Sequence, residues 1–169
     1  MYYHSSCLPV CYCQVTAIWE YDKRSVNGAN FVYFGMFCRG AQGAREKALI
    51  AYSAQVVKAL GILQGPSHME VMYNETTGPC LVEVGSRCHG GEGTWLPVAE
   101  ECLGYSQLDA NLNAFLRPDR FDALPFEPGK GDVIIATLVM CLINKHIFTD
   151  FCLSVFLQRQ PNSDARLSL

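Results

Sequence analysis

The sequence predicts an α+β fold in which an antiparallel sheet is covered by helices. Three observations support this fold class: a pair of β-type segments near the amino terminus, one amphipathic helix, and a second strand pair directly after that helix. Segments 15–19 and 31–36 are short runs of apolar, β-branched and aromatic residues, separated by a polar stretch with the turn signal Asn27-Gly28. We expect a strand in each segment.

The helix is predicted over residues 45–60, where apolar residues recur at three- and four-residue spacing and Gly61 supplies the end. Segments 68–73 and 80–85 follow as strands, and the loop 74–79 between them is rich in turn-forming residues. This order predicts a hairpin with the helix packed on it.

Two further helices are expected beyond the hairpin. A short one around 97–103 ends at Gly104, and Ser106 with Asp109 three residues later resembles a capping box at the start of the next helix. Pro118 ends that helix. Its regularly spaced apolar residues are Leu108, Leu112 and Phe115.

Composition and charge exclude one class of partner and indicate a compartment. The chain has 169 residues, a net charge of −3 and no cluster of Lys and Arg, so DNA and RNA are excluded as primary partners. Its nine cysteines form no CxxC pair and are odd in number, which favours reduced intracellular thiols. The amino terminus lacks the features of a secretory signal. We therefore expect a cytoplasmic location.

The hairpin brings two acidic residues together. If the loop is symmetric, Tyr73 lies opposite Cys80 and Glu70 lies opposite Glu83. Like charges directly opposite each other on paired strands are destabilising. Both carboxylates could turn into water, one could take up a proton, or a divalent cation such as Mg²⁺ could lie between them.

Strand alternation adds an arginine to the same face. Glu83, Gly85 and Arg87 point one way, while Val82 and Val84 are expected to point to the core. The guanidinium could be a simple ion-pair partner, but beside a metal it suits bidentate capture of phosphate or carboxylate. Gly85 is expected to leave room for a ligand.

At these residues the chain closely resembles the closing segment of ATP-grasp carboxylate–amine ligases, and the L-amino-acid ligase branch in particular. The two glutamates and the arginine have the spacing of that branch. Many ATP-grasp enzymes carry an asparagine metal ligand where this chain has Gly85. The matching residues are Ala59-Leu60-Gly61, Gly65, His68, Glu70, Gly78-Pro79, Glu83, Arg87 and Gly90-Gly91.

The resemblance implies a sheet-and-helix fold like the ATP-grasp carboxy-terminal subdomain, with ATP and Mg²⁺ bound there. Glu70 and Glu83 would hold the Mg²⁺ ions that bridge the ATP phosphates, and Arg87 would stabilise the acyl phosphate and the tetrahedral intermediate. Gly90 and Gly91 would let the backbone approach the acyl group. The substrates would be small, amino-acid-like carboxylates and amines joined through an amide bond.

The resemblance extends over about 15–126, so we expect a partial ATP-grasp domain there, an unassigned segment 1–14, and an apolar tail 127–169. No room is left before residue 15 for a nucleotide-clamping subdomain. Two functions therefore stay open: an incomplete ligase domain, or a non-catalytic nucleotide- and metal-binding remnant or membrane- or protein-interaction module. Polar residues interrupt the apolar segment 132–157, so a membrane span is not expected.

Overall fold

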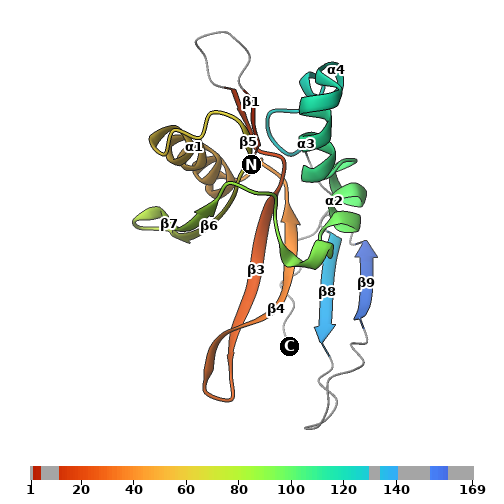
Figure 1. The fold of residues 1–169 in the computed structure, drawn as a ribbon. Coiled ribbons are helices and arrows are strands. Elements are labelled where there is room, and N and C mark those ends of the chain that lie inside the picture. Colours follow the sequence, from red (N-terminus) through yellow and green to blue (C-terminus); the bar gives the residue numbers. More distant parts are fainter. Residues whose placement is uncertain (1, 5–11, 130–133, 141–152, 160–169) are drawn as a thin grey trace.

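The structure is a computed structural model that describes residues 2–4, 12–129, 134–140 and 153–159 (Figure 1). All of its strand pairs are antiparallel, and helices pack beside them, so the predicted α+β class is confirmed. The strands form three sheets, with the orders β2-β1-β5, β3-β4-β8-β9 and β6-β7. The elements are β1 (Tyr2–His4), β2 (Tyr12–Gln14), β3 (Ile18–Val26), β4 (Ala29–Arg39), α1 (Ala44–Ala59), β5 (Gly65–Pro66), β6 (His68–Asn74), β7 (Gly78–Gly85), η1 (Gly91–Gly93), α2 (Leu96–Leu103), α3 (Gln107–Leu116), α4 (Pro118–Asp122), β8 (Ile134–Met140) and β9 (Leu153–Arg159).

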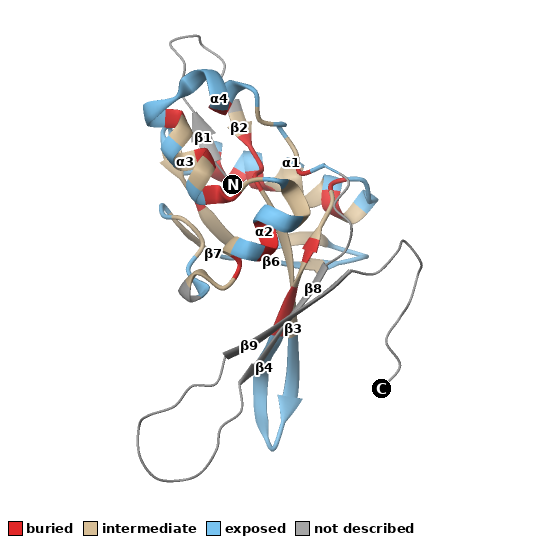
Figure 2. Cartoon of the chain, turned by 90° about the vertical axis from the view of Figure 1, so that its right-hand side faces the viewer, coloured by how far each residue is buried: buried red, intermediate tan, exposed pale blue. Residues whose placement is uncertain are grey.

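A long hairpin of β3 and β4 forms an arm that extends from the body of the protein (Figure 1). Its turn is Asn27-Gly28, as predicted, and both residues have left-handed backbone angles, with φ of 50° and 80°. The predicted strand limits, 15–19 and 31–36, were wrong, because the polar stretch between them is itself paired. Both faces of the distal arm are exposed (Figure 2), so polar side chains are compatible with strand structure there.

The predicted amphipathic helix is present as α1, and Gly61 after it has the left-handed φ of 64° expected of a helix end. Val57 of α1 is fully buried and packs with Val15, and with the partly buried Ile50 and Met69. This contact places α1 against the starts of β3 and β6.

The β6–β7 hairpin keeps the predicted pairing of Glu70 with Glu83 but not the rest of the predicted register. Tyr73 lies opposite Pro79 and not Cys80, and a bulge beside Glu70 absorbs the difference. The hairpin turn is therefore shorter than the predicted loop 74–79.

The short turn has a local cause. The Asn74 Oδ1 atom accepts hydrogen bonds from the backbone N–H groups of Thr76, at 2.8 Å, and Thr77, at 3.2 Å. Gly78 supplies the left-handed φ of 78° that closes the turn. The bulge also reverses one prediction, because Val82 is 56% exposed and does not point to the core.

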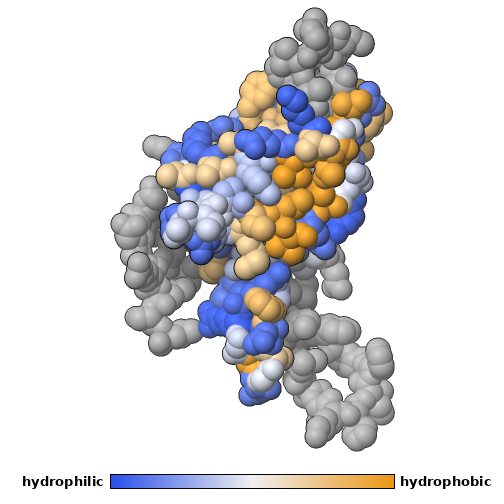
Figure 3. Space-filling model, turned by 90° about the vertical axis from the view of Figure 1, so that its left-hand side faces the viewer, coloured by the Kyte–Doolittle hydropathy of each residue, from blue (hydrophilic) through white to orange (hydrophobic). Residues whose placement is uncertain are grey.

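Apolar side chains gather in one area of the face that carries α1 and the β6–β7 hairpin (Figure 3). The exposed large apolar residues in the stretch from the end of α1 to β7 are Leu60, Leu63, Met72 and Val82.

The predicted helices α2 and α3 are present. Trp95 and Ala99 are buried and pack against Met36 of β4, which holds α2 on that strand. Gly104 ends α2 with a left-handed φ of 78°. The predicted capping box of Ser106 and Asp109 is formed at the start of α3. The side of α3 that faces the protein carries Gln107, Ala110 and Ala114, whereas its apolar residues Leu108, Leu112 and Phe115 are exposed.

In the tail, β8 pairs with β4, and β9 pairs with β8, so these strands extend the sheet of the arm. No helix in the described part of the chain is long and apolar enough to cross a membrane. The polar interruption at 144–150 lies outside the described residues.

Candidate functional site

The structure places two carboxylates directly opposite each other, Glu70 on β6 and Glu83 on β7. A third charge joins them from another sheet, because the Lys23 Nζ atom lies 3.3 Å from the Glu70 Oε2 atom. This ammonium group offsets part of the repulsion between the carboxylates. No group of three or more His, Cys, Asp or Glu side chains suited to a metal occurs within the described residues. A cation at Glu70 and Glu83 would therefore need further ligands from a bound substrate or water.

Arg87 follows the end of β7, and its Nη1 atom donates a hydrogen bond to the Cys88 carbonyl at 3.1 Å. A Cβ atom added to Gly85 would lie 3.3 Å from the Arg87 Nε atom. The Arg87 side chain lies in the space beside Gly85, because the glycine lets the guanidinium lie against the strand. Room for a ligand between Glu83 and Arg87 stays a prediction.

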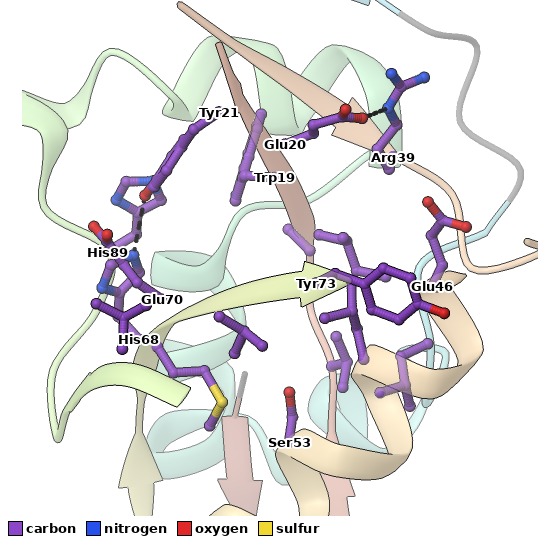
Figure 4. Close-up of a pocket in the computed structure, with 18 of the residues that line it drawn as sticks. Trp19, Glu20, Tyr21, Arg39, Glu46, Ser53, His68, Glu70, Tyr73 and His89 are labelled. Carbon is purple, nitrogen blue, oxygen red and sulfur yellow. Dashed lines mark hydrogen bonds and ion pairs between the residues drawn. The ribbon is translucent and has the colours of Figure 1, made fainter. Parts of the chain in front are cut away.

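Two residues of β3, Tyr21 and Lys23, contact the strand that carries Glu70. Tyr21 is seen beside His68 in Figure 4. The Tyr21 hydroxyl is hydrogen-bonded to the His68 Nε2 atom at 3.3 Å, and Lys23 is paired with Glu70. Side chains two apart on a strand share a face, so each strand presents an aligned pair to the other. Sequence reasoning did not identify Tyr21 or Lys23 as site residues, because each contacts a residue 47 positions away in the sequence.

The charges of the three predicted site residues converge on His68 and Tyr21. Burial lowers the pKa of His68, Arg87 lowers it further, and Glu70 and Glu83 oppose that change. Burial raises the pKa of the Tyr21 hydroxyl, and the Glu70 carboxylate raises it further. The pKa values of His68 and Tyr21 therefore respond to the charges of both glutamates and the arginine.

The glycine-rich loop after Arg87 is held by aromatic contacts. The His89 ring stacks on Trp95 with centroids 5.4 Å apart and lies 4.5 Å from the His68 ring. The Trp95 Nε1 atom donates a hydrogen bond to the Gly90 carbonyl at 2.7 Å, and Gly91 has a left-handed φ of 59°. Gly90 and Gly91 therefore lie in an ordered turn beside the site.

His89 is half-buried, and its burial together with the neighbouring His68 lowers its pKa to about 4. The imidazole is therefore neutral at physiological pH. Neither ring nitrogen has a hydrogen-bond partner among the residues that the structure describes. Such a ring can donate or accept a hydrogen bond without adding charge.

A cavity of about 660 Å³ opens between β3, α1 and β6. His68 and Glu70 line one part of it (Figure 4), while Glu83 and Arg87 are not among its lining residues. At another part of the wall, Glu20 accepts hydrogen bonds from Arg39 at 2.7 Å and Arg45 at 3.1 Å. The cavity therefore adjoins the carboxylate pair but does not contain the whole predicted site.

Comparisons with known proteins agree with the motif. The chain is 38% identical over 106 residues to dapdiamide A synthase from Enterobacter agglomerans, a match that covers 63% of this chain and 24% of that protein. Its fold is similar to the crystal structure of an L-amino acid ligase from Bacillus licheniformis, with a TM-score of 0.56 and 25% identity, over 74% of this chain and 31% of that one. No family model matches the chain. The chain thus spans 24% of the length of the synthase and 31% of the length of the L-amino acid ligase.

Proposed function

Because this chain resembles ATP-grasp carboxylate–amine ligases over part of their length, we propose that it supplies the Mg²⁺- and phosphate-binding end of an ATP-dependent ligase. The observation that carries the proposal is the direct opposition of Glu70 and Glu83 across the hairpin. Arg87 follows two residues after the end of β7. The predicted resemblance is confirmed by the two relatives, and the roles of these residues are our proposal.

The chemistry of the donors suits Mg²⁺. Glu70 and Glu83 offer hard oxygen ligands, and their mutual repulsion is relieved when a divalent cation binds. Bound Mg²⁺ would neutralise charge on the ATP phosphates. Lys23 already contacts Glu70, so a second positive group stands next to the position proposed for the metal.

Arg87 is proposed to stabilise the transition state. Its guanidinium has five N–H donors, and one hydrogen bond, to the Cys88 carbonyl, is seen in the structure. In the reaction that the resemblance implies, a substrate carboxylate takes the γ-phosphoryl group of ATP, and an amine then displaces phosphate to form an amide. Arg87 would stabilise the negative charge that develops in both steps. The backbone of Gly90 and Gly91 would approach the acyl group.

The proposed substrates are small, amino-acid-like acids and amines. The affinity for ATP depends on groups that contact it equally in the ground and transition states. This chain spans 24% of its relative, so it holds only part of the residues that contact ATP in a full-length ligase. We therefore expect weak Mg²⁺-dependent ATP binding and negligible turnover by this chain. The second candidate is a non-catalytic nucleotide- and metal-binding module.

Calorimetric titration with ATP, with and without Mg²⁺, tests the proposal. Binding should require Mg²⁺ and should weaken in Glu83→Gln, whereas Glu75→Gln, an exposed charge change in the same hairpin, should bind as the unmodified chain does. Binding that is indifferent to Mg²⁺, or equal in both variants, would contradict the proposed metal site.

Phosphate release in the presence of ATP and amino-acid pairs separates the two candidates. Turnover of about 1–10³ s⁻¹, lost in Arg87→Ala, would show that the chain is a sufficient ligase and not a binding module. Mg²⁺-dependent ATP binding without turnover would support the binding module.

A further inference from the structure

Gln107, the first residue of α3, connects two segments that lie far apart in the sequence. Its Oε1 atom accepts a hydrogen bond from the backbone N–H of His89 at 2.7 Å, and its Nε2 atom donates one to the Ser67 carbonyl at 3.0 Å. Gln107 is 6% exposed and Ser67 is fully buried. One buried amide group thus ties a loop to the start of a strand.

The two connected segments carry the two halves of the proposed site. Ser67 immediately precedes β6, which bears Glu70, and His89 comes two residues after Arg87. The β6–β7 ladder fixes Glu83 opposite Glu70 but ends at Gly85, before the arginine. The position of the Arg87 loop relative to β6 therefore depends on contacts beyond the ladder, and the Gln107 amide supplies one of them.

The chemistry of both contacts requires a carboxamide. One end of the Gln107 side chain must accept a hydrogen bond and the other must donate one, which neither a carboxylate nor a thioether can do. The residue before Gln107 is anchored, because the Ser106 N–H donates to the Asp109 carboxylate at 2.9 Å in the capping box of α3. Removing the amide would leave a half-buried N–H and a buried carbonyl without this partner, which is costly.

We propose that Gln107 is a positioning residue of the Mg²⁺–phosphate site, and that its amide holds the Arg87 loop at a set distance from the Glu70 strand. The effect on nucleotide binding rests on the proposed function. The mechanical link itself does not.

Three variants test the link. Gln107→Met removes both hydrogen bonds at similar volume, and Gln107→Glu keeps an acceptor for the His89 N–H but loses the donor to Ser67. Gln55→Met makes the same chemical change at an exposed position on α1 and serves as the control. Amide hydrogen exchange, Mg²⁺–ATP affinity and thermal unfolding are measured for each.

In Gln107→Met we expect faster exchange at the His89 amide. We also expect about a ten-fold loss of Mg²⁺–ATP affinity, because the Arg87 loop is no longer held relative to β6. Gln107→Glu should retain protection at His89 and an intermediate affinity. Gln55→Met should match the unmodified chain in both measurements.

Unchanged exchange at His89 in Gln107→Met, or a loss of affinity as large in Gln55→Met, would overturn the inference. If the unmodified chain binds no Mg²⁺–ATP, the proposed function fails, and exchange at His89 still decides whether Gln107 holds the loop. If Gln107→Met does not fold, the Mg²⁺–ATP affinity of Gln107→Glu decides it, since an affinity equal to that of the unmodified chain would contradict a need for both bonds.

Discussion

Glu83→Gln should raise the stability of the metal-free protein and lower its response to Mg²⁺. The substitution keeps the size of the side chain but removes one of the two charges that face each other across β6 and β7. Two opposite effects of one change are expected only if the carboxylate pair is a cation site, because a purely structural glutamate would give no Mg²⁺ response.

The magnitude follows from the surroundings. A cross-strand charge pair is worth about 0.2–1 kcal/mol, and Lys23 at 3.3 Å from Glu70 already offsets part of the repulsion. We expect a gain of about 0.5 kcal/mol, which for a chain of this size raises Tm by about 1–2 °C. At Mg²⁺ ten times above its Kd, the unmodified protein should gain about 1.4 kcal/mol, so the order of stability reverses.

Urea unfolding with and without Mg²⁺, followed by tryptophan fluorescence, measures both effects. Glu75→Gln removes an exposed charge from the same hairpin and should change neither value. If Glu83→Gln lowers stability without metal, or keeps the full Mg²⁺ response, the reasoning about the carboxylate pair is refuted.

Three further predictions concern the surroundings of the site. Trp95→Phe should cost about 0.5–1.5 kcal/mol in urea unfolding, because it loses the hydrogen bond to the Gly90 carbonyl but keeps a ring against His89. Val57→Ala, at a fully buried position, should cost about 1.5–3 kcal/mol, whereas Val26→Ala at the end of β3 should stay within about 0.5 kcal/mol. The pKa of His89 is about 4 in the folded protein against 6.5 ordinarily, so the unfolded chain binds the proton first and stability falls as the pH drops from 6.5 toward 4. His89→Gln should have a shallower fall in unfolding free energy over that range, and an unchanged slope would contradict burial of a neutral ring.

Much of the fold could be predicted from local patterns. The spacing of apolar residues and Gly61 located α1, and Ser106 with Asp109 located the start of α3, because these signals act within a few residues. The opposition of Glu70 and Glu83 was also predicted from the hairpin. These features depend on contacts that a single segment of sequence defines.

Features that depend on contacts between separate segments could not be predicted from the sequence. The bulge beside Glu70 shifted the register at Tyr73 and exposed Val82, since a one-residue change moves side chains to the other face. Lys23 reaches Glu70 across two sheets, and Gln107 reaches two backbone segments, so no single stretch of sequence contained either contact.

The most direct test of the central claim is crystallography of the protein with Mn²⁺ and ADP, using the anomalous signal of manganese to locate the metal. We expect a peak between the Glu70 and Glu83 carboxylates, with oxygen atoms of both at about 2.1 Å, as in a Mg²⁺ site. The same crystal of Glu83→Gln should show a weaker peak or none. A peak at another position, or equal peaks in both proteins, would contradict the claim that this carboxylate pair binds the metal.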